Sequence, residues 1–176
     1  GTPNPSGYAD PAGAEAEGVT MKALTVWQPW ASLIVHGLKT VEWRGYAFPP
    51  SLRGQRIVIH AGKPNPEKGI KHLLAERYAI RKSCGPDCDV AAIREALDRM
   101  LSRLPLVPVC AGIGEVTLVE PESAQNLYAR HGIKLGGSGP WNWAWKLRDP
   151  VAWPHPIEAR GAQGFWPWPH RISEAT

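Results

Sequence analysis

Four polar residues lie close enough in the sequence to form one ligand site: Lys39, Thr40, Glu42 and Arg44. A lysine beside a carboxylate can hold a phosphate as part of a charged pair, and when desolvated it can act as a general base or proton donor. The alternative is a solvated strand whose ion pairs contribute little to stability. Residue types and spacing alone leave both interpretations open.

These residues lie where a helix is expected to pass into a strand. Residues 28–37 place Pro29 where a first helical turn accepts it and Gly37 where a left-handed C-terminal cap favours glycine. Apolar and polar side chains then alternate over residues 39–44, which is typical of a strand with two different faces. We therefore expect this strand to direct its polar side chains into the mouth of the sheet that it joins.

The rest of the chain supplies the elements of an α+β domain. Further strands are expected at residues 22–27, 55–61, 108–120 and 141–147, and within 157–168. Apolar spacing predicts amphipathic helices over 67–81 and 89–104 and a short helix over 123–131. This order favours a mixed, partly closed β-barrel of five to six strands, with a helix after strand one and a flanking helical hairpin at about 67–104.

The chain has nine tryptophans, and their positions favour two different roles. The three at residues 141, 143 and 145 recur at period two, as in a barrel interior, and are expected in the core more than in a ligand site. Three others lie in motif segments and could stack a base, at about 1–3 kcal/mol each: Trp27, Trp30 and Trp166. Gln28 can both donate and accept hydrogen bonds and could read the edge of a base.

Composition and charge limit the class of protein. The first twenty residues, GTPNPSGYADPAGAEAEGVT, lack apolar periodicity and are expected to be a disordered tail, with one domain over residues 21–176. The domain has 20 Lys and Arg against 13 Asp and Glu, a net charge of +7 that attracts polyanions. The sequence predicts neither a secretory signal nor a membrane span, so we expect a cytoplasmic protein.

The cysteines and histidines do not predict a metal or cofactor site. Three cysteines cannot all pair in disulfides, and the gap between Cys84 and Cys88 fits only half of a zinc site, without the ligands to complete it. His36 and His60 are expected to be structural hydrogen-bonding residues. The sequence has no nucleotide-binding glycine motif and no nucleophilic Ser or Cys arrangement. We therefore expect no cofactor, and a metal-free mechanism if the protein is an enzyme.

Several motifs make the sequence similar to the ASCH domain family. Members carry Gly-x-Lys-x-x-Glu-x-Arg after a helix, and residues 37–44 match every specified position. The run LTVWQPWASLI at residues 24–34 resembles the start of bacterial and phage members. Further matches are His-Ala-Gly-Lys at 60–63, Gly-x-Gly-x-x-x-Leu at 112–118, Trp-Ala-Trp at 143–145 and Gly-Ala-Gln-Gly-Phe-Trp at 161–166. The resemblance covers roughly residues 22–169.

The resemblance implies a PUA-like barrel with a pocket between the first helix and the sheet, whose ligand is RNA or a nucleotide, with DNA as an alternative. The residues expected to act in catalysis, if there is any, are Lys39, Glu42 and Thr40. The residues expected to bind the nucleic acid are Arg44, Trp27, Gln28, Trp30, Lys63, Gln163 and Trp166.

Hydrolysis is the alternative function that the resemblance implies. Some small ASCH proteins are amidohydrolases that release the acyl group of N4-acetylcytidine with a Lys, a Thr three residues later and a distant Glu. Lys39 matches that Lys, but Glu42 stands where those enzymes have Thr, and a carboxylate there would orient a water or accept the amino hydrogens of a base. Glu115 is a candidate for the distant Glu. A ribonuclease and a protein-interaction module using the charged hairpin are further alternatives.

Overall fold

The structure is a computed structural model that describes residues 20–135, 139 and 142–171. Residues 1–19 of the expected tail, and Trp141, lie outside the described residues. The strands are β1 (Lys22–Val26), β2 (Val41–Arg44), β3 (Arg56–Ala61), β4 (Ala111–Ser123), β5 (Trp143–Glu158) and β6 (Phe165–Pro167). The helices are α2 (Trp30–Val35), α3 (Pro66–Ala75), α4 (Ala79–Cys84), α5 (Val90–Ser102) and α6 (Ala124–Ala129), with short 3-10 turns at Pro50–Leu52 and Leu104–Leu106.

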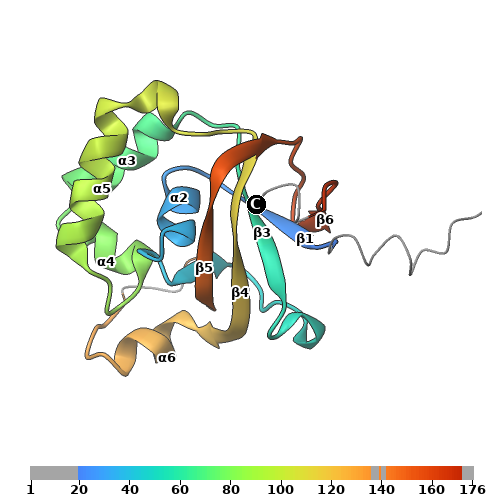
Figure 1. The fold of residues 1–176 in the computed structure, drawn as a ribbon. Coiled ribbons are helices and arrows are strands. Elements are labelled where there is room, and N and C mark those ends of the chain that lie inside the picture. Colours follow the sequence, from blue (N-terminus) through green and yellow to red (C-terminus); the bar gives the residue numbers. More distant parts are fainter. Residues whose placement is uncertain (1–19, 136–138, 140–141, 172–176) are drawn as a thin grey trace, which may run out of the picture.

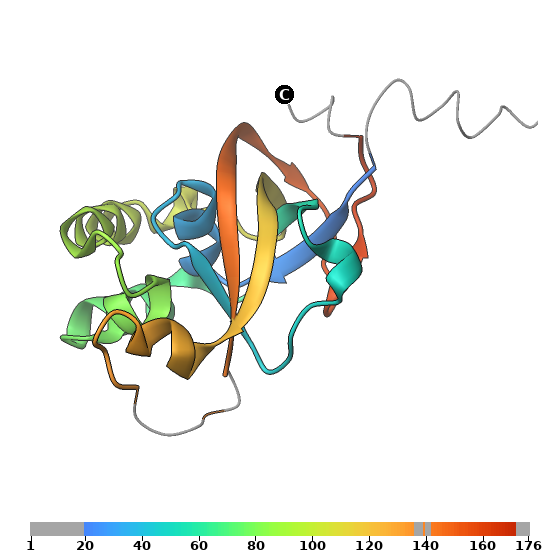
Figure 2. The ribbon, with the colours of Figure 1, turned by 90° about the horizontal axis from the view of Figure 1, so that it is seen from below.

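The strands form one mixed sheet in the order β2-β5-β4-β3-β1-β6 (Figure 1). β1 and β3 are parallel, and the connection between them contains α2 and β2; every other neighbouring pair is antiparallel. The registers of β3 with β4 and of β4 with β5 shift near Gly112, as expected for bulges in a curled sheet. Figure 2 shows the strands crossing as the sheet curls. The predicted α+β, partly closed barrel is confirmed.

Helix α2 lies between the sheet and a layer formed by α3, α4 and α5 (Figure 1). Ile34 and Val35 pack with the apolar residues of the sheet, including the fully buried Trp145. Leu33 instead packs with residues of α3, α4 and α5 such as Ile70. One short helix therefore packs in two apolar cores. This packing fixes the position at which the turn toward Lys39 and β2 begins.

The first of the two predicted amphipathic helices is divided in the structure. α3 ends at Ala75, Glu76 is extended, and α4 begins at Ala79. A continuous helix would place Arg77 on the same face as the buried Ile70 and Leu73. The break leaves Arg77 exposed and allows α4 to turn toward α2 and β2. The prediction of one helix over 67–81 is wrong in this respect.

Strand β5 is longer than the predicted segment 141–147, since it continues to Glu158. Prolines at residues 150, 154 and 156 weaken the strand pattern of this region, because proline cannot donate to a neighbouring strand. Its pairing with β4 here uses Val151, Ala152, Ile157 and Glu158, and so leaves the prolines out of the paired positions.

Candidate nucleic-acid site

A cavity of about 760 Å³ lies where β1, α2, β2 and α4 meet the segment before β6. This size is in the usual range for sites that hold a small ligand. Its lining residues are Thr25, Val26, Trp27, Trp30, Lys39, Glu42, Trp43, Arg44, Tyr46, Ser83, Ala162, Gln163 and Gly164. We call it the Lys39 cavity.

Lys39 is held inside the fold by the turn that ends α2. Gly37 has a positive φ of 76°, the left-handed conformation that the sequence predicts for it. The backbone N–H groups of Leu38 and Lys39 both donate to the carbonyl of Leu33, at 2.9 and 3.0 Å. The turn directs the Lys39 side chain inward, where only 1% of its surface is exposed. Burial lowers the pKa of Lys39, and the charge of Glu42 opposes that shift.

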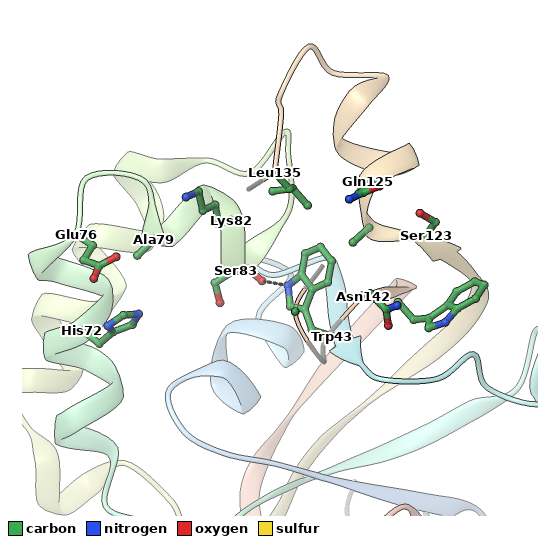
Figure 3. Close-up of a pocket in the computed structure, with 13 residues that line it drawn as sticks. Trp43, His72, Glu76, Ala79, Lys82, Ser83, Ser123, Gln125, Leu135 and Asn142 are labelled. Carbon is green, nitrogen blue, oxygen red and sulfur yellow. Dashed lines mark hydrogen bonds between the residues drawn. The ribbon is translucent and has the colours of Figure 1, made fainter. Parts of the chain in front are cut away.

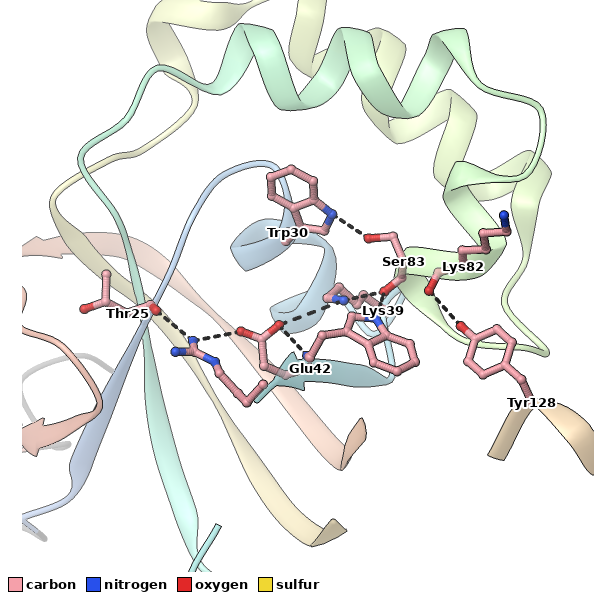
Figure 4. A network of polar contacts seen from close by, with 9 residues as sticks. Thr25, Trp30, Lys39, Glu42, Lys82, Ser83 and Tyr128 are labelled. Atoms are coloured by element: carbon pink, nitrogen blue, oxygen red, sulfur yellow. Dashed lines mark hydrogen bonds and ion pairs between the residues drawn. The ribbon is translucent and has the colours of Figure 1, made fainter. Parts of the chain in front are cut away.

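The carboxylate of Glu42 is the centre of a charged cluster in this cavity (Figure 4). Arg44 Nη2 lies 2.9 Å from Glu42 Oε2, and Lys39 Nζ lies 4.0 Å from Glu42 Oε1. The same Nη2 of Arg44 donates to the carbonyl of Thr25 at 3.0 Å, and the guanidinium lies 5.7 Å from the ring centre of Trp145. With Lys39 protonated, the two cations and one anion have a net positive charge. Arg44, with 18% of its side chain exposed, is the more accessible cation.

Ser83 of α4 connects the helical layer to this cluster, and sequence reasoning missed it. Its hydroxyl accepts the indole N–H of Trp30 at 2.6 Å. Its backbone carbonyl accepts from Lys39 Nζ and from the indole N–H of Trp43, the latter at 2.8 Å. Figure 4 shows Ser83 between Trp30 and Lys39. Nothing in the local sequence distinguishes this serine, because its partners lie more than thirty-five residues away along the chain.

Aromatic side chains surround the charged cluster. Trp27 and Tyr46 both line the cavity, with 60% and 48% of their surfaces exposed. Trp30 and Trp43 also line it and are partly buried. The sequence pattern placed Trp43 on the strand face away from Glu42, and it identified neither Trp43 nor Tyr46 as a site residue. Exposed indole and phenol rings beside a positive cluster can stack nucleic-acid bases.

The structure brings together six of the ten predicted site residues: Lys39, Glu42, Arg44, Trp27, Trp30 and Gln163. Thr40 is exposed and does not line the cavity, because β2 begins only at Val41 and the Thr40 hydroxyl is directed toward Gly85. Lys63 is exposed and also lies outside the lining.

Gln28 and Trp166 are occupied in structural contacts near the cavity. Gln28 is 2% exposed; its Nε2 donates to Ser32 Oγ at 2.7 Å and to the Pro108 carbonyl at 3.0 Å, and its Oε1 accepts the Ser32 N–H. These bonds use the amide to hold the first turn of α2. Trp166 is 9% exposed, and its indole N–H donates to Thr25 Oγ1 at 3.1 Å.

The other candidate groups lie outside the cavity. His60 is buried between Thr25 Oγ1, at 3.1 Å, and the Ala159 carbonyl, at 2.7 Å, and burial lowers its pKa. Glu115 accepts from Arg56 at 2.8 Å and lines a different cavity. Burial raises the pKa of the Cys84 thiol to about 11, which keeps it protonated at neutral pH. Within the described ranges, no three His, Cys, Asp or Glu residues are grouped so that they could hold a metal ion, and no helix is long and apolar enough to cross a membrane.

Comparison with known proteins agrees with the motif analysis. The sequence pattern of the ASCH domain matches residues 24–133, more than half of the chain. No match was found among curated proteins. Among solved structures, an ASCH protein from Zymomonas mobilis is 19% identical, with 78% of this chain and 73% of that chain covered and a TM-score of 0.43. A mutant form of the Zymomonas mobilis protein gives 21% identity, coverage of 78% and 75%, and a TM-score of 0.42. By its sequence pattern, the chain belongs to the ASCH domain family.

Proposed function

We propose that the protein binds single-stranded RNA by taking one nucleotide into the Lys39 cavity. The observation that carries this proposal is a buried cluster of net positive charge, formed by Lys39, Glu42 and Arg44, beneath an exposed aromatic rim. The family is associated with RNA binding. Specific recognition of RNA uses single-stranded bases that stack on aromatic rings and form hydrogen bonds through their edges.

Each part of the cavity suits one part of a nucleotide. Trp27 offers an exposed ring for stacking. The Glu42 carboxylate can accept hydrogen bonds from the exocyclic amino group of a base. Arg44 is the cation that a phosphate can reach, whereas Lys39 is almost fully buried and acts through its charge and by holding Glu42. A positive potential in a recessed, partly apolar site is focused and draws in anions.

The test measures the affinity of the protein for a short labelled single-stranded RNA, and for DNA of the same sequence, over a series of salt concentrations. Arg44→Ala should weaken RNA binding about ten-fold, because it removes a charge-assisted hydrogen bond. It should also make the dependence of log Kd on log salt less steep by about 0.7, the value for one phosphate contact on a single strand. Arg99→Ala is the control, since Arg99 is an exposed arginine of α5 outside the lining.

The proposal requires that the two arginine variants differ. Equal effects of Arg44→Ala and Arg99→Ala would mean that RNA is held by general surface charge rather than by the cavity. Affinity for RNA that does not depend on salt or on Arg44 would refute the proposal directly. Tighter binding to DNA than to RNA would change the identity of the polymer while leaving the cavity as the site.

Metal-free hydrolysis is the second candidate, and the lowered pKa of Lys39 favours it. A lysine with a lowered pKa has more free amine near neutral pH and can act as a general base. Glu42 could then orient the attacking water onto an acylated cytidine or onto an RNA phosphodiester. Incubation with N4-acetylcytidine or with RNA, in the presence of a chelator, should give product with the unaltered protein and none with Lys39→Met. Absence of product from both substrates would refute this function without affecting the binding proposal.

A further inference from the structure

A second cavity lies on the other side of Trp43, and we infer that it holds the neighbouring nucleotide of the same RNA strand. The inference rests on the proposed function of the Lys39 cavity. The second cavity has a volume of about 520 Å³, which is enough for a small ligand. It is formed by residues of α3 and α4 on one side and by α6 and the start of β5 on the other (Figure 3). We call it the Lys82 cavity.

The two cavities are adjacent, because they share two lining residues. Trp43 and Ser83 line both of them. The indole N–H of Trp43 donates to the carbonyl of Ser83 at 2.8 Å, so that the ring is fixed in place between them. In Figure 3 the Trp43 ring projects into the space between α4 and Asn142. A strand whose first base enters the Lys39 cavity can therefore continue past Trp43 without leaving the surface of the protein.

The lining of the Lys82 cavity has the chemistry of a base-binding site. It offers side-chain amides at Gln125 and Asn142 and a hydroxyl at Ser123, which can donate to and accept from the edge of a base. The partly buried rings of Trp43 and Trp143 provide apolar surface for stacking. These residues differ from the charged cluster of the Lys39 cavity. The two cavities would therefore make different contacts with their nucleotides.

Lys82 is the cation that would neutralise the phosphate joining the two nucleotides. It directly precedes Ser83, which lies at the junction of the two cavities, and its own side chain lines the second one. Its backbone is fixed, because its carbonyl accepts from the Tyr128 hydroxyl at 2.9 Å. Glu76 also lines this cavity, but within residues 20–135, 139 and 142–171 no acidic side chain, Glu76 included, forms an ion pair with Lys82, so its ammonium group is available to a phosphate.

The experiment compares the affinities of a ribonucleoside monophosphate and of a diribonucleotide, measured by calorimetry on the full chain. The diribonucleotide should bind about ten-fold more tightly, because its second base stacks and is held in place by the contacts of Lys82 and Asn142. Lys82→Ala and Asn142→Asp should each remove most of this difference while leaving the affinity for the monophosphate unchanged. Both residues are exposed, so neither substitution disturbs the core. Arg44→Ala should weaken both ligands equally, and Arg99→Ala should weaken neither.

Three results would overturn the inference. Equal affinities for the two ligands would show that only one nucleotide is held. If Lys82→Ala weakened the binding of both ligands to the same extent, Lys82 would contribute only general electrostatic attraction and would not belong to a second subsite. Failure of the unaltered protein to bind the monophosphate, the diribonucleotide or RNA would refute the proposed function as well, whereas the first two results leave it standing.

Discussion

Replacing Lys39 by methionine tests whether a charged lysine is buried in the cavity. Methionine fills a similar volume without a charge, and the change leaves little unpaired. Glu42 keeps Arg44 at 2.9 Å, and the carbonyl of Ser83 keeps the indole N–H of Trp43. Removing one partner of a buried ion pair is costly when it leaves the other charge unpaired, but here Arg44 keeps Glu42 paired, and losing a buried charge that is not needed for pairing removes a desolvation penalty. We therefore expect the variant to be at least as stable as the unaltered protein at neutral pH.

The size of the difference in stability between Lys39→Met and the unaltered protein should depend on pH. The folded-state pKa of Lys39 lies below its ordinary value of 10.5, because burial disfavours the charged form. Between these two pKa values the unfolded chain binds one more proton than the folded chain. The stability of the unaltered protein therefore rises with pH in this window, by up to about 1.4 kcal/mol per pH unit. Lys39→Met removes this term, so its stability advantage should be largest below the window and should shrink as the pH rises toward 10.5.

Urea unfolding followed by tryptophan fluorescence, at a series of pH values above neutrality, measures this difference. Lys71→Met is the matched control, because Lys71 is 62% exposed and forms only a surface ion pair with Glu67. For the control variant, the difference in unfolding free energy from the unaltered protein should not change comparably with pH. If the difference in unfolding free energy between Lys39→Met and the unaltered protein were constant over this range, Lys39 would not be a desolvated titrating group.

Three further perturbations test the contacts around the site. Ser83→Ala removes the acceptor of the Trp30 indole N–H and should lower the free energy of unfolding in urea by about 1 kcal/mol; unchanged stability would contradict the bond. Gly112→Ala would place a Cβ 2.3 Å from the Trp168 ring, so thermal unfolding should show a loss of about 1–3 kcal/mol, part of which Trp168→Leu should recover. Burial lowers the pKa of His60 below 6.5, so stability should fall as the pH drops from 6.5 toward the lowered pKa, a trend that His60→Gln should remove from thermal unfolding curves.

The parts of the site that follow from local pattern could be predicted from the sequence. The turn after α2 depends on Gly37 and its neighbours, and the alternation after it placed Glu42 and Arg44 on a common face. Both are properties of a few consecutive residues. The same alternation failed for Thr40, because that residue precedes β2 and its backbone is held by bonds to Cys84 and Leu147.

The parts that depend on distant contacts could not be predicted. Ser83 acts through Lys39, Trp43 and Trp30, and no local pattern marks it. The break between α3 and α4 depends on how the apolar face of α3 packs against the other helices. Tertiary packing overrides local helical preference in such cases.

The energetics of the cluster favour a ligand as the explanation for its charges. Burying Lys39 carries a desolvation penalty, and its ion pair with Glu42, at 4.0 Å, offsets that only in part, as the direction of the pKa shift shows. An apolar side chain at this position would fill the same space, and the Trp43 indole N–H and Arg44 would still satisfy the Ser83 carbonyl and Glu42. Stability therefore does not account for a lysine here. A role toward a ligand does account for it. The desolvation that weakens the folded state also strengthens the attraction between the buried charge and an anion bound at Arg44, or raises the fraction of the lysine that is in its basic form.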